Sequence, residues 1–139
     1  MTHFIKAVTS IVVTFLIFFG VPVLVYSSFQ RFLGMVPPSQ LSTVAVYQLA
    51  GLKALEAFIL VILFLLVIER RRGKERKYAF FLAFLLFVQG GLITELWTHL
   101  TLHSPTLYAA AGVCSAFLSY GVAAWFLAKL YHSTSSIMM

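Results

Sequence analysis

Residues 57–88, AFILVILFLLVI-ERRRGKERK-YAFFLAFLLFV, decide the fold, because a short segment with six basic residues separates two strongly apolar runs. Both runs belong to longer apolar stretches, and two more such stretches lie at either end of the chain. About 20 apolar residues of helix cross the hydrocarbon core of a bilayer. The sequence therefore predicts an all-α integral membrane protein with four transmembrane helices, over residues 4–26, 49–68, 79–102 and 106–131.

The composition supports this prediction. Of the 139 residues, 61% are hydrophobic and only 10% are charged. A soluble domain of this size could not bury so much apolar surface. Strands of a membrane β-barrel alternate in polarity, whereas the runs here are apolar on every side. Four spans leave only short loops, so residues 1–139 are expected to form a single transmembrane domain.

The basic segment between the second and third spans predicts the orientation. Clusters of lysine and arginine stay on the cytoplasmic side of a membrane. Lys6 and Lys129 then fall on the same side if the spans form an up-down bundle with both termini in the cytoplasm. We expect the cluster to fix the topology and to attract anionic lipid headgroups, with a dedicated phosphoinositide or partner site as the alternative. A nucleic-acid partner is not expected. The basic cluster consists of Arg70, Arg71, Arg72, Lys74, Arg76 and Lys77.

The span boundaries carry a few further expectations. The first apolar run is too long for a cleaved secretory signal and is predicted to be retained as a span. It should end near Tyr26, with a kink at Pro22, and be followed by a short interfacial piece before Pro37. The second helix is expected from about Gln40 to about Arg72.

The fourth span carries small residues at four-residue spacing. This period lets two helix backbones approach closely in a membrane. It predicts packing within the bundle or, alternatively, a contact with another subunit or a second copy of the chain. The main stripe consists of Ala111, Ser115, Ser119 and Ala123, and a parallel one of Gly112, Ala116, Ala124 and Ala128.

Polar residues gather in the half of the second and third spans that lies away from the basic segment. Lys53 and Glu56 are three residues apart, and Glu95, His99 and His103 recur every four residues. At about 1.5 Å of rise per residue, Lys53, Glu56 and Glu95 fall at similar depths. An ionisable group inside a membrane normally faces a partner or water. The sequence therefore predicts that Lys53, Glu56 and Glu95 lie at compatible depths on neighbouring helices. Two arrangements remain open: the Glu and His side chains converge, or they fan out toward lipid headgroups and water.

Three hypotheses remain open for this cluster. In the first, a structural network of Lys53, Glu56, Gln89 and Glu95 sets the helix register, with Lys53 paired to Glu95 or to Glu56. In the second, Glu95, His99 and His103 bind a divalent metal together with Glu56, since two histidines and a carboxylate form a common ligand set. The third is a proton or substrate relay through Glu56 or Glu95.

No recognisable catalytic motif accompanies these residues. The chain has no aspartate, no G-x-S-x-G, no H-E-x-x-H and no C-x-x-C. The leading functional hypothesis is therefore a non-catalytic accessory, assembly or stabilising subunit of a larger membrane complex. The alternatives are a metal-binding or redox-associated membrane protein and a small oligomeric ion- or proton-coupled transporter. The expected partners are the lipid bilayer and other membrane subunits or further copies of the chain.

Overall fold

The computed structural model describes residues 3–35, 43–71 and 73–135, and every regular element in these ranges is helical. Four helices are long and apolar enough to cross a membrane: His3–Leu33, Thr43–Arg70, Glu75–Leu102 and Thr106–His132. These helices indicate a multi-pass membrane protein, as predicted. Arg72 and the expected start of the second helix at Gln40 lie outside the described residues.

The first helix, α1 (His3–Leu33), is longer than expected. It does not end near Tyr26 but continues through the residues predicted to form a separate interfacial piece. Pro22 is accommodated inside the helix, as is common in membranes, where neighbouring helices satisfy the freed backbone groups. The helix ends at Gly34, which adopts a left-handed φ of 65°. This conformation costs glycine little and is a frequent helix terminator.

A tight turn joins α2 (Thr43–Arg70) to α3 (Glu75–Leu86). Gly73 has a φ of 84° in this turn. Its backbone N–H donates a hydrogen bond to Oε1 of Glu75 at 2.8 Å, and the Glu75 side chain is buried. The basic segment is therefore a structured turn around a buried carboxylate.

The third spanning helix contains a change of geometry that was not predicted. A π-helical segment, η1 (Phe87–Ile93), separates α3 from α4 (Thr94–Leu102). The Thr94 hydroxyl donates to the carbonyl of Gln89, five residues earlier, at 3.2 Å. Gly90 and Gly91 lie inside the segment. Such π segments occur frequently at functional sites.

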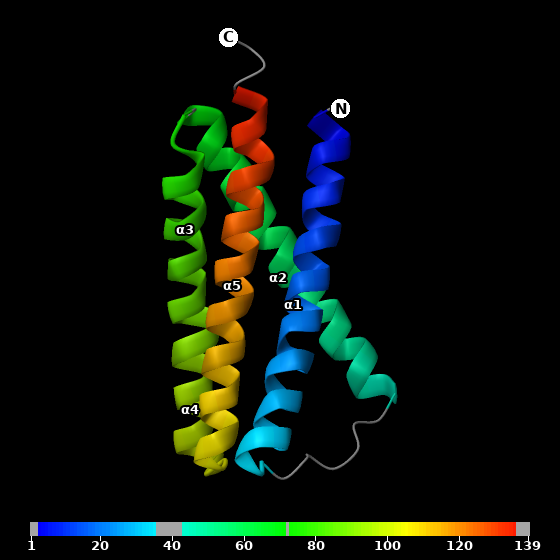
Figure 1. Cartoon of the computed structure of the whole chain (residues 1–139), viewed down its shortest axis with the longest axis vertical. Helices are drawn as coiled ribbons and strands as arrows, with labels where there is room; N and C mark the ends of the chain where they lie inside the picture. Colours follow the sequence, from blue (N-terminus) through cyan, green and yellow to red (C-terminus); the bar gives the residue numbers. More distant parts are fainter. Residues whose placement is uncertain (1–2, 36–42, 72, 136–139) are drawn as a thin grey trace.

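The last helix, α5 (Thr106–Ser135), is the centre of the bundle. It packs against α1, α3, η1 and α4, whereas α2 packs against α1 and α3. The fully buried side chains include Phe18, Leu60, Phe64 and Leu127. On α2 all buried residues lie in its second half, at Ala57, Leu60, Val61 and Phe64. The first half of α2 diverges from α3, α4 and α5 (Figure 1).

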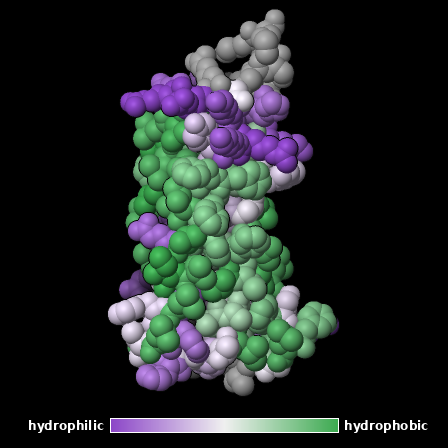
Figure 2. Space-filling model, turned by 90° about the vertical axis from the view of Figure 1, so that its left-hand side faces the viewer, coloured by the Kyte–Doolittle hydropathy of each residue, from purple (hydrophilic) through white to green (hydrophobic). Residues whose placement is uncertain are grey.

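The two ends of the molecule differ in charge. The start of α1, the end of α5 and the α2–α3 turn lie together at one end (Figure 1), which we call the basic end. The end of α1 and the α4–α5 connection lie at the opposite end. Figure 2 shows a broad apolar band between a strongly hydrophilic basic end and a more mixed opposite end. This distribution is the one expected for a chain that crosses a bilayer.

Candidate functional site

An ion pair within α2 is the first part of the candidate site. Nζ of Lys53 lies 2.9 Å from Oε2 of Glu56, one turn further along the helix. The side chains remain 27% and 40% exposed, respectively. Of the two partners that the sequence left open for Lys53, the structure selects Glu56 for direct contact.

Glu95 approaches the same region from α4. Its carboxylate lies directly over the backbone of Gly112 on α5, in the space that a Cβ atom at that position would need. Lys53 and Glu95 are within electrostatic range of each other. Lys53 thus contacts Glu56 directly, and the convergence of Glu95 with this pair stays a prediction.

Three tyrosines complete this polar site, and sequence analysis assigned none of them to it. Tyr26 of α1 is within electrostatic range of Glu95 and of Tyr108. Tyr120 of α5 is within range of Glu56, and its ring packs edge-on against Phe18 with centroids 4.9 Å apart. Tyr120 could have been suspected, because a tyrosine in the middle of a span usually needs a polar neighbour.

Of the two histidines near the opposite end, His99 follows Glu95 on α4, whereas His103 lies beyond the end of this helix. Nδ1 of His99 lies 2.6 Å from the carbonyl oxygen of Ser104. His103 has a left-handed backbone, with φ 50° and ψ 38°, and is the residue at which α4 ends. Pro105 follows two residues later, which explains why the helix cannot continue. The four-residue spacing therefore holds for Glu95 and His99 but not for His103.

The metal hypothesis receives no support from these positions. Within residues 3–35, 43–71 and 73–135, no group of three histidine, cysteine, aspartate or glutamate side chains lies close enough to hold a metal ion. One ring nitrogen of His99 is already engaged with the Ser104 carbonyl. Glu56 is engaged with Lys53, and a cation beside a ligand would disfavour a second cation.

The remaining predicted site residues are placed as follows. Gln89 lies on η1 and is exposed. The four small residues of the main α5 stripe, Ala111, Ser115, Ser119 and Ala123, are all buried. The described members of the basic cluster, Arg70, Arg71, Lys74, Arg76 and Lys77, are all exposed around the α2–α3 turn. The predicted roles of the small residues in helix packing, and of the basic cluster in topology and lipid binding, stay predictions.

Fold and site together define a small multi-pass helical membrane protein with a half-buried polar cluster. The chain matches no known family model, no curated protein and no solved structure.

Proposed function

We propose that this chain is a non-catalytic subunit of a larger membrane complex, in which a helix of another subunit covers the first half of α2. In this proposal the four spans form an up-down bundle with both termini in the cytoplasm. The observation that carries it is the exposure of residues 43–56: none of them is buried, although most are apolar.

The Lys53–Glu56 pair makes lipid an unfavourable neighbour for this part of α2. Charged residues near the centre of a spanning helix cost about 2.5–3.5 kcal/mol each on insertion scales, so they normally face protein or water. Here both side chains of the pair are partly exposed. A partner helix would remove this exposure and would add close packing, which is the main force between helices in lipid.

Affinity purification in a mild detergent tests the proposal. We expect the wild-type chain to retain a defined partner, and Leu52→Trp, which adds bulk to an exposed position of α2, to lose it. Leu118→Trp is the matched control, because Leu118 is similarly apolar and exposed but lies on α5. A wild-type chain that purifies alone as a monodisperse species would contradict the proposal, as would equal partner loss in both variants.

Ion- or proton-coupled transport is the second candidate. It is favoured by one observation: Lys53 of α2 pairs with Glu56 and lies within electrostatic range of Glu95 on α4. Intramembrane carboxylates of this kind often mark ion pathways. The candidate requires ion-dependent flux in liposomes that is lost in Glu95→Gln or Glu56→Gln. Glu69→Gln, at an exposed position beside the α2–α3 turn, should leave that flux unchanged.

A further inference from the structure

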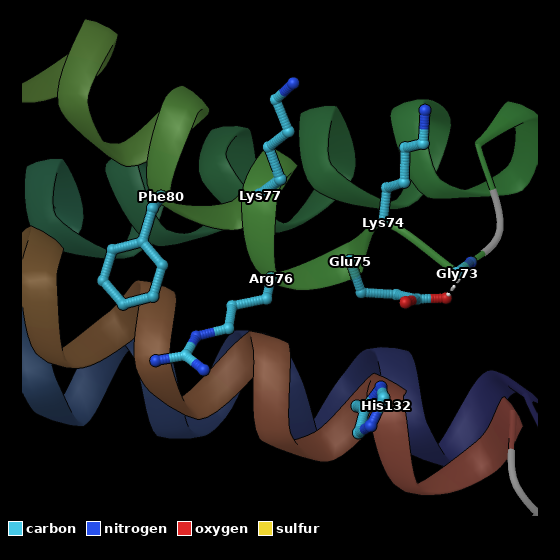
Figure 3. Close-up of a pocket in the computed structure, with 7 residues that line it drawn as sticks. All are labelled: Gly73, Lys74, Glu75, Arg76, Lys77, Phe80 and His132. Carbon is cyan, nitrogen blue, oxygen red and sulfur yellow. Dashed lines mark hydrogen bonds between the residues drawn. The ribbon is translucent and has the colours of Figure 1, made fainter.

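A hollow of about 560 Å³ lies at the basic end, between the first turns of α3 and the end of α5. Arg76, Lys77, Lys74 and Phe80 line it from the α3 side, and His132 lines it from α5. In Figure 3 the side chains of Arg76 and Phe80 extend toward α5, whereas Lys74 and Lys77 extend in another direction from α3. The Arg76 guanidinium turns toward Phe80 and away from His132 in this view, so a ligand in the hollow can reach Arg76 beside Phe80 (Figure 3).

An apolar surface lies next to the polar lining of this hollow. Arg76, Phe80 and Phe84 follow one another at four-residue spacing, so they lie on the same side of α3. Trp125 precedes His132 by seven residues and therefore shares its side of α5. Phe80, Phe84 and Trp125 are all exposed. The hollow therefore lies at the edge of the apolar band, and these exposed aromatic side chains extend from it toward the middle of the band.

We propose that this hollow binds the phosphate of an anionic phospholipid, with an acyl chain lying along Phe80 and Phe84. The Arg76 guanidinium can donate two parallel hydrogen bonds to a phosphate. Basic pockets between spanning helices on the cytoplasmic side suit such headgroups. The Glu75 carboxylate also lines the hollow, but it accepts the hydrogen bond of the Gly73 N–H and lies on the side away from the Arg76 guanidinium (Figure 3).

This proposal is independent of the proposed subunit function, since it concerns a different end of the molecule. It also differs from a general attraction between a basic segment and an acidic membrane. A general attraction depends on the number of charges in the turn, whereas the proposed site depends on Arg76 in particular. Arg70 allows the two to be separated, because it lies in the same turn but lines a different hollow, with Leu66 and Tyr78.

Tryptophan quenching by brominated lipids tests the site in the full-length protein. The chain has two tryptophans, so in a Trp97→Phe background all tryptophan fluorescence comes from Trp125. In phosphatidylcholine liposomes, we expect phosphatidylglycerol with dibrominated acyl chains to quench Trp125 with an association constant about fivefold above that of dibrominated phosphatidylcholine. Trp125→Phe, in which Trp97 reports from α4, should show no such preference.

The variants decide between a site and a diffuse attraction. Arg76→Ala should bring the preference at Trp125 close to parity, whereas Arg70→Ala, with the same loss of charge, should retain most of it. An equal loss in the two variants, or no preference in the parent protein, would overturn the proposal. Circular dichroism of each variant verifies that the helices are intact.

A final measurement distinguishes binding of a lipid phosphate from binding of free inorganic phosphate. If inorganic phosphate abolishes the preference at an ionic strength at which chloride does not, the hollow is a site for the free anion and the lipid assignment is wrong. If both salts weaken the preference equally, the occupant is the lipid headgroup, and the weakening is ordinary screening.

Discussion

At the scale of single residues, Gly91 and Gly112 determine how the third spanning helix meets α5. A Cβ atom at Gly91 would lie 2.6 Å from Cβ of Ala116 and 3.0 Å from Cδ2 of Phe87. Gly91 lies in η1 and is buried. The close approach of the two helices at this point therefore depends on the missing side chain, in the manner typical of small residues at membrane helix contacts.

Gly91→Ala should destabilise the bundle. Replacing glycine by alanine inside a helix normally favours the helix by up to about 1 kcal/mol. Here the added methyl group must push two backbones apart, and overpacking typically costs about 1–3 kcal/mol. We expect a net loss in the free energy of unfolding in mixed detergent micelles. Gly121→Ala on α5 is the control, because nothing lies within 4 Å of its added Cβ; equal stabilisation by both substitutions would contradict the contact.

Gly112→Ala tests the position of Glu95. The added methyl group should displace the Glu95 carboxylate, so the substitution should cost stability in the wild type and much less in a Glu95→Ala background. Directly interacting pairs show coupling energies of about 0.5–3 kcal/mol in double-mutant cycles. We expect a value in this range for Gly112 with Glu95. The pair of Gly121→Ala with Glu95→Ala should be additive, and additivity for both pairs would show that Glu95 does not lie over Gly112.

At the scale of secondary-structure elements, α2 consists of two halves with different environments. Phe64 in the second half is fully buried and contacts Tyr131 edge-on, with ring centroids 5.5 Å apart. Phe58 lies less than two turns earlier and is 48% exposed. Phe58 therefore lies on an exposed face of the second half, whereas in the first half, residues 43–56, no side chain is buried on any face.

Phe64→Ala and Phe58→Ala should differ strongly in stability. Because lipid is as apolar as a protein core, burial itself contributes little in a membrane, and the main cost of Phe64→Ala is the cavity and the lost packing. We expect a loss of about 1–3 kcal/mol for Phe64→Ala. For Phe58→Ala in the isolated chain we expect little change. Both are measured as unfolding free energies in mixed micelles, and similar losses would mean that the face of α2 that carries Phe58 also packs inside the bundle.

The elements also differ in how well the sequence predicted them. The spans were predicted well because apolar length alone specifies them. The extension of α1 beyond Tyr26 was missed, since Ser27, Ser28, Gln30 and Arg31 are polar but compatible with a helix that leaves the membrane. The π segment was missed because hydropathy carries no information on backbone hydrogen bonding, although Gly90-Gly91 marked its place. The Lys53–Glu56 pair followed from the three-residue spacing on one helix. The position of Glu95 over Gly112 could not be predicted, because it depends on the rotation of α4 and the π segment changes the helical period before it.

At the scale of the whole molecule, the distribution of positive charge is the main asymmetry. Of the ten lysines and arginines, only Arg31 and Lys53 do not belong to the basic end in the sequence. Such an imbalance favours retention of the basic end in the cytoplasm during insertion. The membrane potential, negative inside, acts in the same direction on positive charge.

Cysteine labelling in intact cells tests this orientation. In a Cys114→Ala background, Leu102→Cys places a thiol at an exposed position near the α4–α5 connection, and Glu69→Cys places one beside the α2–α3 turn. We expect a membrane-impermeant maleimide to label Leu102→Cys in intact cells and Glu69→Cys only after permeabilisation, because six positive charges oppose translocation of that turn. The Glu69 substitution removes no positive charge, so it does not weaken the feature under test. Labelling of Glu69→Cys from outside would place the basic end, and with it the proposed phospholipid site, on the external face.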